Sequence, residues 1–367
     1  MRIAHVVATF PPHVGGMGRV AYDEAYGLSR RGHDVTVFTL AYWGAHYCSD
    51  NLPFRVVRLW PLFQLGDAGF IPQLLWRLRH FDLVHFHYPW YGAGDMVWWA
   101  SLLWQERYVV TYHMDAVPSG AIKRMLQALY DAMWPRFIFG RAERICIVDQ
   151  AHYVEARFGR RASKKIVLLP NAVDTTIFKP TEEKKSNGQQ IVFVGNLLPV
   201  KRLDLLLQAL VTVPSAELAV VGGGYAEKDY RRQAEKLGVN ARVRWIGVCS
   251  DPALLAGYYR AADVAVVPSE RESFSLAVLE ALASGLPVIA SDFTGVAERV
   301  ENGKNGFLFA SGCSDDLAEK LKIFFALTRE ERQAMGEAAR AKALEYSLDI
   351  HLNMLEKVYQ QVNNVAI

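Results

Sequence analysis

Two successive series of strand and helix signals run along this chain, and they constrain its fold more than any other feature. In the first series, short runs rich in Val, Ile and aromatic residues are separated by helical patterns. The expected strands are residues 3–9, 34–40, 54–59, 83–87, 108–113 and 144–148. Continuous apolar strands that alternate with helices predict a parallel sheet that is buried on both faces.

A second series begins near residue 190, with the strand candidates IVFVG, ELAVVGGG, VRWIG, VAVVP, LPVIAS and GFLF. Because 367 residues are too many for one comfortable core, the two series predict an α/β chain with two Rossmann-like domains that face each other across a cleft. We expect an N-terminal domain over residues 1–170 and a C-terminal domain over residues 188–345. PNAVDTTIFKP and the polar run 181–190 are expected to link them. Residues 346–367 are expected to form a helix that packs back on the N-terminal domain.

The composition excludes disorder and gives no argument for nucleic-acid binding. Hydrophobic residues make up 51% of the chain and charged residues 22%, and the net charge is only +3. The charge is uneven, because residues 1–170 hold 19 Lys and Arg against 13 Asp and Glu, and residues 171–367 hold 22 against 25. This asymmetry suits an anionic partner or a membrane surface near the N-terminal half.

Cysteine usage and hydropathy predict a cytoplasmic enzyme, with peripheral attachment to the inner face of the membrane left open. The four cysteines are scattered without a CxxC motif, which is typical of free thiols in a reducing compartment. No apolar stretch reaches the roughly 20 residues that a membrane span needs. The N-terminal run MRIAHVVATF lacks a cleavage-type site and is interpreted as a buried strand.

The segment PSERESFSLAVLEALASGLPVIAS, residues 268–291, carries the most chemical information. It follows the strand VAVVP, so its loop lies at the carboxyl end of a strand, where ligands bind in such sheets. Ser273 or Ser275 can cap a helix that starts near Leu276. The N–H groups around Phe274 to Leu276 then join the positive helix end in an anion site.

Two carboxylates flank this predicted anion site, and they would repel a phosphate that they faced directly. Glu280 is therefore expected to accept hydrogen bonds from ribose hydroxyls, and Glu272 from hydroxyls of a transferred sugar. The alternative is that Glu270, Glu272 and Glu280 are only solvated charges, and the spacing gives the two interpretations about equal weight.

Glu272-x7-Glu280 within this segment resembles the signature of the retaining nucleotide-sugar glycosyltransferases of the GT-B fold, family four. The resemblance covers nearly the whole chain. The segments FPPHVGGMGRVAYDEAYGLSRRGHDVTVFT, TYHMD, LPNAVDTTIF, VGNLLPVKRLDLLLQAL and VVGGGYAEKDYRRQAEKLG are similar to the family's motifs and stand in the family's order. The resemblance implies a GT-B chain whose two Rossmann-like domains close over the donor and exclude water.

The resemblance also implies roles for residues of the first half. Gly15 and Gly16 would let the backbone approach the donor phosphates, because neither carries a side chain. A plain turn is the alternative for this pair. His113, at the end of a strand, corresponds to the family's active-site histidine near the transferred sugar, whereas a lone histidine there is more often structural.

Lys201 corresponds to the family's diphosphate lysine. Breaking the sugar–phosphate bond builds charge on the leaving diphosphate, and a positioned cation stabilises the transition state by roughly 2–4 kcal/mol. Since no metal-binding Asp-x-Asp occurs, we expect neither a metal nor another cofactor. The chain departs from the family at Asn196, where Arg is usual, and at Arg202, where Gly is common. Either Arg202 supplies the missing charge or Asn196 donates a hydrogen bond to the phosphate.

Aromatic and basic residues of the first half point to the acceptor. Eight of the nine tryptophans lie between residues 43 and 134. A helical stripe near the end of this zone contains Ile122, Met125, Leu126, Leu129, Tyr130, Met133, Trp134 and Phe137, and Lys123, Arg124 and Arg136 lie off the stripe. Such a helix can lie in a membrane interface, or its stripe can pack on the sheet, which periodicity alone favours slightly. Many bacterial members of the resembled family use lipid-linked acceptors, which favours the membrane.

The expected function is transfer of a hexose from a UDP- or GDP-sugar to a hydroxyl of a lipid-linked glycan or glycolipid, in the synthesis of cell-envelope polysaccharide. Retention of configuration is implied by the resemblance, and no residue is required to be a covalent nucleophile. Rival functions are a nucleotide-sugar epimerase or phosphorylase, and a non-catalytic sugar-nucleotide or lipid-binding module. A nicotinamide oxidoreductase is disfavoured because Gly222-Gly223-Gly224 lacks the GxGxxG spacing and is interpreted as a turn lining the nucleotide pocket.

Overall fold

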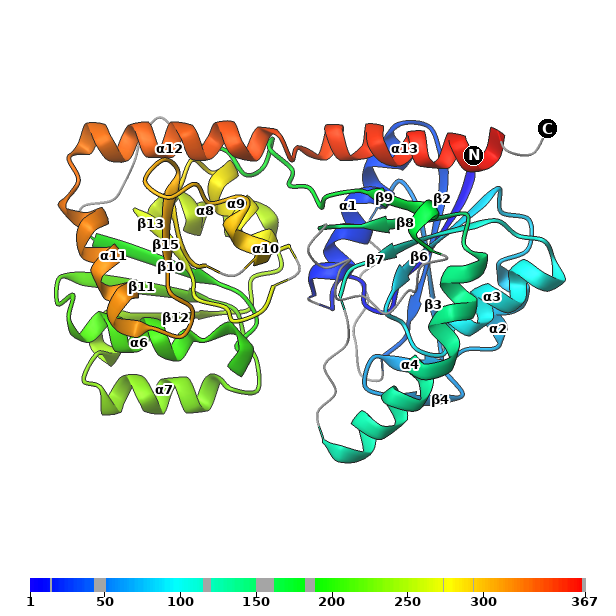
Figure 1. Cartoon of the computed structure of the whole chain (residues 1–367), viewed down its shortest axis with the longest axis horizontal. Coiled ribbons are helices and arrows are strands. Elements are labelled where there is room, and N and C mark those ends of the chain that lie inside the picture. The colour runs from blue at the N-terminus through cyan, green and yellow to red at the C-terminus, as the bar shows by residue number, and fades with distance from the viewer. Residues whose placement is uncertain are drawn as a thin grey trace. The chain divides into compact units, whose positions relative to one another are not determined.

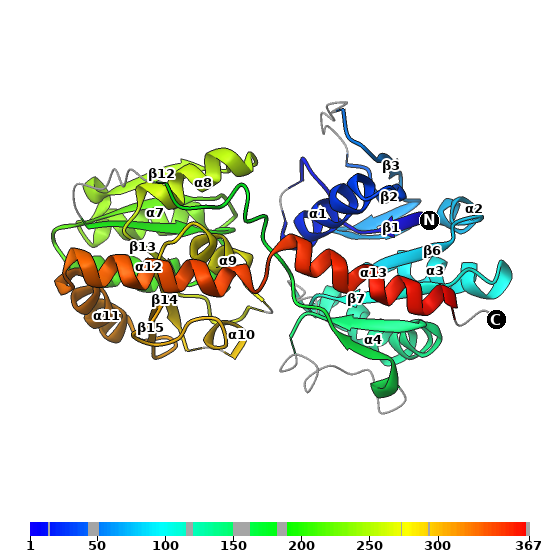
Figure 2. The ribbon, with the colours of Figure 1, turned by 90° about the horizontal axis from the view of Figure 1, so that it is seen from above.

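The chain forms two compact α/β units in the computed structural model (Figures 1 and 2). The structure describes residues 1–13, 15–42, 51–114, 120–149, 162–181, 189–272, 274–292 and 294–364. The first unit comprises Met1–Asn171 and Leu348–Ile367, and the second comprises Ala172–Ser347. Each unit is built around its own parallel sheet.

The sheet of the first unit has seven strands in the order β3-β2-β1-β6-β7-β8-β9, and every neighbouring pair is parallel. The strands are β1 (Arg2–Val6), β2 (Asp34–Leu40), β3 (Arg55–Leu59), β6 (Leu83–Tyr88), β7 (Tyr108–Tyr112), β8 (Arg144–Ile147) and β9 (Ile166–Leu168). The six strands expected from the sequence are confirmed to within about three residues at each end. Three short strands were not expected, namely β9 and the hairpin of β4 (Phe63–Leu65) and β5 (Ala68–Phe70), because three residues carry too little periodicity to detect.

Helices cover both faces of this sheet, and the side chains of successive strand residues pack against helices on opposite faces. The helices are α1 (Gly16–Arg30), α2 (Gln73–Arg77), α3 (Ala93–Leu103), α4 (Ala121–Arg141) and α13 (Leu348–Asn364). One apolar cluster joins the sheet to α2, α3 and α4, and a second joins its other face to α1 and α13. On β1, for example, Ala4 and Val6 belong to the first cluster, whereas Ile3 belongs to the second.

The second unit has a six-stranded parallel sheet in the order β12-β11-β10-β13-β14-β15. The strands are β10 (Gln189–Val194), β11 (Ala216–Val221), β12 (Val243–Gly247), β13 (Val264–Val267), β14 (Val288–Ser291) and β15 (Gly306–Phe309), as the sequence predicts. The helices are α6 (Leu203–Val211), α7 (Glu227–Lys236), α8 (Pro252–Ala261), α9 (Leu276–Ala283), α10 (Thr294–Ala297), α11 (Ser314–Ala326) and α12 (Arg329–Leu344).

The segment PNAVDTTIFKP, expected to be a linker, packs on the second unit over most of its length. Arg340 of α12 donates hydrogen bonds to the carbonyls of Thr175 and Phe178, at 3.0 and 2.7 Å. The Phe178 ring is buried and lies against Tyr259. The linker prediction is wrong for this stretch, because a turn-rich composition does not reveal that the half-buried Arg340 will satisfy its carbonyls.

In both sheets the strand order reverses at one point, between β1 and β6 and between β10 and β13. Loops that leave the carboxyl ends of the two strands at such a point diverge and open a crevice for ligands. Lys201 and Glu272 follow β10 and β13, whereas Gly15 and Gly16 follow β1. The topology therefore places most of the predicted site residues where an α/β sheet binds its ligands.

Candidate functional site

Lys201 and Glu272 are in direct contact in the second unit. Lys201 ends a 3-10 turn, Pro199–Lys201, that follows β10, and Glu272 lies in the loop after β13. The Lys201 Nζ donates a hydrogen bond to Oε1 of Glu272, and Ser269 Oγ donates to the same oxygen at 2.9 Å. The side chains are 23% and 13% exposed. Two residues that lie 71 positions apart thus form a cation–carboxylate pair at the strand ends.

The start of α9 differs from the sequence prediction. Ser275 occupies the N-cap position, but its side chain makes no capping hydrogen bond and its φ is 54°. Its buried Oγ has no hydrogen-bond partner among the described residues. The prediction that Ser275 caps the helix is therefore wrong, since a left-handed backbone turns the hydroxyl away from the helix N–H groups. The other candidate, Ser273, lies outside the described residues.

Phe274 anchors this loop through its side chain. The ring is buried, the guanidinium of Arg299 lies 3.6 Å from its centroid, and Tyr346 packs edge-on at 5.9 Å. The helix α9 begins two residues later, at Leu276. The packing of Phe274 leaves only its backbone to serve a ligand.

Glu280 lies on α9 and is held by a tyrosine of α8. The Tyr259 hydroxyl donates a hydrogen bond to Oε2 of Glu280 at 2.9 Å. Burial, followed by the nearby charge of Glu280, raises the pKa of Tyr259 well above its ordinary value, so that the hydroxyl remains a donor. The carboxylate therefore has a defined orientation on the helix that starts at the predicted anion site.

Arg202 has a backbone conformation that explains why glycine is common at this position. Its φ is 51° and ψ 38°, in the left-handed region. The guanidinium bonds Asp204, with Nη2 to Oδ2 at 3.0 Å, and also Oε1 of Glu270. The hydrogen bond and charge of Asp204, with a further contribution from Glu270, raise the pKa of Arg202. Two acids thus oppose the charge that Arg202 could lend to a phosphate, while Asn196 is exposed.

The triple glycine after β11 supports the loop that bears Asn196. A Cβ on Gly222 would lie 1.9 Å from the Gly195 carbonyl oxygen, and one on Gly224 would lie 2.4 Å from that of Leu197. The N–H of Leu197 donates to the carbonyl of Gly223 at 2.9 Å. These glycines are needed for the close approach of two backbone loops.

In the first unit, Gly15 is the N-cap of α1 and Gly16 its first residue. The φ of Gly15 is −175°, which any residue can adopt, so its lack of a side chain matters for space and not for backbone freedom. The neighbouring Gly18 does require glycine, because a Cβ there would lie 2.5 Å from the carbonyl oxygen of Thr9. The start of α1 is therefore tightly packed against the segment that follows β1.

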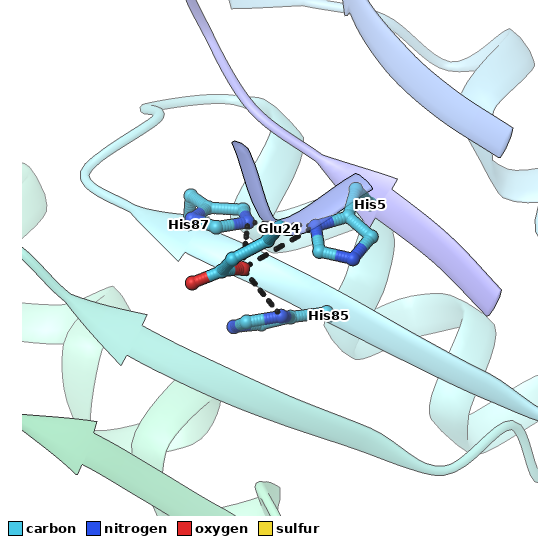
Figure 3. Close-up of side chains that lie close together, drawn as sticks. All are labelled: His5, Glu24, His85 and His87. Atoms are coloured by element: carbon cyan, nitrogen blue, oxygen red, sulfur yellow. Dashed lines mark hydrogen bonds and ion pairs between the residues drawn. The ribbon is translucent and has the colours of Figure 1, made fainter. Parts of the chain in front are cut away.

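His113 follows β7 and is buried, and its ring continues a chain of histidines. The Nε2 atom of His113 lies 3.0 Å from Nδ1 of His87, and Nε2 of His87 lies 3.0 Å from Nδ1 of His5. Figure 3 shows that His5, His85 and His87 converge on the carboxylate of Glu24, which comes from α1. The Oε2 atom of Glu24 lies 3.4 Å from His85 and 3.7 Å from each of the other two.

The buried carboxylate is charged although burial opposes it. Burial alone would raise the pKa of Glu24, but His85, His351 and His5 together lower it to about 2. Burial lowers the pKa of His5 and of His113 to about 4, that of His85 to about 3, and that of His87 well below its ordinary value, so these rings are neutral at pH 7. His351 of α13 differs, since its hydrogen bond and ion pair with Glu24 outweigh burial and raise its pKa.

The sequence prediction did not include this cluster, although the sequence holds a signal for it. His5, His85 and His87 stand at fully buried positions of expected strands, where apolar residues are the rule. A buried polar side chain needs a partner, and three in neighbouring strands imply a network. What could not be foreseen is that Glu24 and His351, 327 positions apart, complete it.

Most of the apolar stripe of α4 is exposed. Five of its members, Met125, Leu126, Leu129, Met133 and Phe137, are 37–63% exposed. Tyr130 and Trp134 are half-buried, and Lys123 and Arg124 lie on the same helix. The alternative that the whole stripe packs on the sheet is therefore wrong. None of the helices in the described part of the chain is long and apolar enough to cross a bilayer.

Free thiols are found at Cys146, Cys249 and Cys313, whereas Cys48 lies outside the described residues.

Two family models match the chain, one in each half. Residues 174–342 match the model of glycosyl transferases group 1, and residues 14–177 match that of glycosyltransferase family 4. A D-inositol 3-phosphate glycosyltransferase of Corynebacterium jeikeium is 31% identical over an alignment of 405 positions, which covers 95% of this chain and 92% of the relative. A second protein of that name, from Mycobacterium avium, is 29% identical over 95% of this chain and 89% of the relative.

Solved structures share the same fold at low identity. Sucrose-phosphate synthase from Thermosynechococcus elongatus superposes with a TM-score of 0.84 and 22% identity over the full length of both chains. HepE from Anabaena, solved with UDP, gives a TM-score of 0.80 and 20% identity over 98% of this chain and 100% of its own. HepE has also been solved with UDP-glucose, at a TM-score of 0.79.

Proposed function

From the premise that the chain belongs to the group 1 glycosyltransferases of family 4, which have the GT-B fold, we propose that it transfers a hexose with retention from UDP-sugar to a hydroxyl of a membrane-associated acceptor. The transfer of a sugar from a nucleotide-sugar donor is common to the family. The choice of UDP, the retention and the acceptor are the proposal. UDP is preferred to GDP because HepE binds UDP and UDP-glucose.

The contact between Lys201 and Glu272 is the observation that carries the donor site. The pair lies where two loops diverge from the point of strand reversal, beside the start of α9. A diphosphate at this point would take the ammonium group of Lys201 and the N–H groups of Phe274, Ser275 and Leu276. Glu272 would then be released to accept hydrogen bonds from the transferred sugar, with Glu280 serving the ribose.

The Lys201 ammonium and these N–H groups make a metal ion unnecessary for leaving-group stabilisation in this proposal. Gly15, Gly16 and His113 of the first unit keep, in this proposal, the roles towards the donor that the family resemblance implies. Among the substrate-binding residues, Asn196 is preferred to Arg202 as the phosphate donor, because Asp204 and Glu270 oppose the charge of Arg202. Turnover is expected to persist in excess EDTA.

The exposed stripe of α4 supports an acceptor at a membrane surface. Apolar side chains beside Lys123 and Arg124 give both the burial and the charge that an anionic interface attracts. A lipid-linked glycan or glycolipid is the acceptor that such a surface can reach. The second candidate acceptor is a soluble inositol phosphate, because two relatives are D-inositol 3-phosphate glycosyltransferases.

Thermal unfolding with UDP-, GDP- and ADP-sugars tests the donor, since a ligand stabilises the fold that binds it. UDP-sugar is expected to give the largest rise in Tm. Release of free hexose from the donor separates a transferase from a non-catalytic binding module. An epimerase would instead return the donor with an altered sugar.

Flotation with anionic liposomes at low salt tests the acceptor surface. The wild-type protein is expected to float, and Leu129→Ser is expected to float less. Leu254→Ser is the matched control, since Leu254 on α8 is also 63% exposed but belongs to the second unit. A wild-type protein that stays in the soluble fraction and glycosylates inositol phosphate would favour the second candidate.

A further inference from the structure

The buried carboxylate of Glu24 is connected to His113 by two imidazole rings, and the connection has a direction. The links are His5 Nδ1 to His87 Nε2 and His87 Nδ1 to His113 Nε2, both at 3.0 Å. A neutral imidazole has one N–H donor and one acceptor nitrogen. The three neutral rings therefore have only two consistent settings, with protons on all three Nδ1 atoms or on all three Nε2 atoms.

The surroundings of His5 select the first setting. The Nε2 atom of His5 has no hydrogen-bond partner among the described residues, whether it is an N–H donor or an acceptor, so it does not distinguish the two settings. With the proton on Nδ1, the N–H group donates to His87 and also lies 3.7 Å from the negative Oε2 of Glu24. The carboxylate thus favours the N–H group on the side of His5 that faces His87.

The same geometry explains why the carboxylate remains charged. The Nδ1 atom of His351 lies 2.7 Å from the carbonyl oxygen of Pro170, and its Nε2 atom lies 2.9 Å from Oε1 of Glu24. A carbonyl and a carboxylate can only accept, so both nitrogens of His351 carry protons and the ring is a cation. His351 and Glu24 form a neutral buried pair that keeps the anion beside His5.

A divalent metal ion suits this cluster poorly, although His5, Glu24, His85 and His87 offer four ligand atoms within 4.8 Å of one another. Since His351 already balances Glu24, an ion would add two positive charges to the interior. A metal on Nδ1 of His5 would also leave Nε2–H buried without the outer partner that ligating histidines keep.

We propose that Glu24 sets the tautomer of His113 through His5 and His87, so that His113 presents Nδ1–H as a hydrogen-bond donor to an oxygen of the bound donor sugar. Glu24 is then a positioning residue, and His113 is the group that meets the substrate. The tautomer follows from the geometry of the three neutral rings and Glu24, and its use on the sugar rests on the proposed function.

Nitrogen-15 NMR of protein labelled at histidine tests the tautomer directly, with the His113 signals assigned from their loss in His113→Gln. The expected spectrum shows Nδ1 of His113 protonated and Nε2 unprotonated at pH 7. A protonated Nε2 in the wild-type protein would overturn the proposal. So would one equivalent of zinc in protein purified without chelator.

Glu24→Gln tests the cause. The substitution is expected to shift His113 towards Nε2–H and to lower kcat by about 10–100-fold, the range seen when an orienting partner of a functional histidine is removed. The Kd for UDP is expected to stay unchanged. Glu356→Gln is the matched control, because its carboxylate also bonds a histidine, His33, at 3.0 Å, and belongs to α13. It is expected to change neither the tautomer nor kcat.

An unchanged His113 tautomer in Glu24→Gln would also overturn the proposal. If Glu24→Gln does not fold, the spectrum of the wild-type protein still tests the tautomer proposal. The NMR measurement needs no substrate, so it separates the two proposals. If His113 has the Nδ1–H tautomer but the protein transfers no sugar, the proposed function is contradicted and the tautomer proposal is not.

Discussion

Two ion pairs of similar chemistry lie at very different depths in this protein. The side chains of Lys201 and Glu272 are 23% and 13% exposed, whereas those of His351 and Glu24 are 4% and 1% exposed. Water reaches the first pair, so Lys201 or Glu272 can give up its ion-pair partner and bind a ligand instead at little cost in free energy. The second pair cannot be separated without leaving a bare charge in the interior. The Lys201–Glu272 pair is suited to binding and releasing a ligand. The His351–Glu24 pair is suited to keeping a fixed charge distribution in the interior.

The difference follows from where each pair lies in its sheet. The Lys201–Glu272 pair stands in loops beyond strand ends, where Ser269 also donates a hydrogen bond to Glu272. Glu24 and His351 come from two helices that pack over one face of a sheet, and the strand positions beneath them hold histidines. The same residue types thus serve a ligand site or an internal network according to burial.

The largest expected effect is on stability. Glu24→Gln is expected to lower the free energy of unfolding by about 3–5 kcal/mol, because it leaves the His351 cation without its buried partner. Glu272→Gln is expected to change it by less than about 1 kcal/mol. Urea unfolding followed by tryptophan fluorescence measures the loss, since eight of the nine tryptophans belong to the first unit. Equal losses in the two variants would remove the contrast between the pairs.

The next effect is on turnover. Lys201→Ala is expected to lower kcat by about 10²–10³, the usual consequence of removing one charge-stabilising donor from a transition state. Glu272→Ala is expected to lower kcat much more than the affinity for UDP, since its proposed partner is the transferred sugar. Steady-state kinetics and UDP titration separate the two quantities. Unchanged turnover in Glu272→Ala would exclude that residue from the mechanism.

The pH dependence of stability gives a further contrast between the two pairs. Buried neutral histidines determine whether stability rises or falls with pH. Burial holds the pKa values of His5, His85 and His113 at about 4, 3 and 4, below the ordinary 6.5. The unfolded chain therefore binds more protons below about pH 6.5, and stability falls as the pH is lowered towards 5. Each of these histidines contributes up to about 1.4 kcal/mol per pH unit in that window.

His351 and Glu24 do not reverse this sign. The pKa of His351 is raised, so its contribution is fully present below pH 6.5 and is lost only as the pH rises through its folded value. The contribution of Glu24 is lost between its ordinary pKa of 4.5 and about 2. Thermal unfolding of the wild-type protein at pH 7, 6 and 5 measures the slope, and a Tm that does not fall would contradict it.

The sequence predicts the strands of both sheets well, because buried parallel strands have unbroken apolar runs, as in β10 and β13. It also places Lys201 and Glu272 at strand ends, from which their contact follows once the strand order is known. The order itself is a long-range property, and no local pattern in the chain encodes that β10 pairs with β13.

The errors have a common physical origin. Ser275 satisfies the composition of a cap, but its left-handed backbone, which only the folded loop determines, prevents capping. The stripe of α4 has the periodicity of a buried helix face, yet Leu129 is exposed. In each case the local pattern is present and the tertiary environment decides its use.

The smallest expected effect concerns Arg202, whose charge is opposed by neighbours in the way that the charge of Lys201 is opposed by Glu272. Arg202→Gly would relieve the left-handed backbone, worth roughly 1 kcal/mol, and lose ion pairs worth about 0–1 kcal/mol. The free energy of unfolding is therefore expected to change by less than about 1 kcal/mol. The affinity for UDP-sugar is expected to stay within about twofold, because Asp204 and Glu270 already occupy the guanidinium. Arg202→Lys is the control that keeps both the charge and the backbone strain. A tenfold loss of donor affinity in the glycine variant, with the lysine variant intact, would instead make Arg202 the second cation of the donor site.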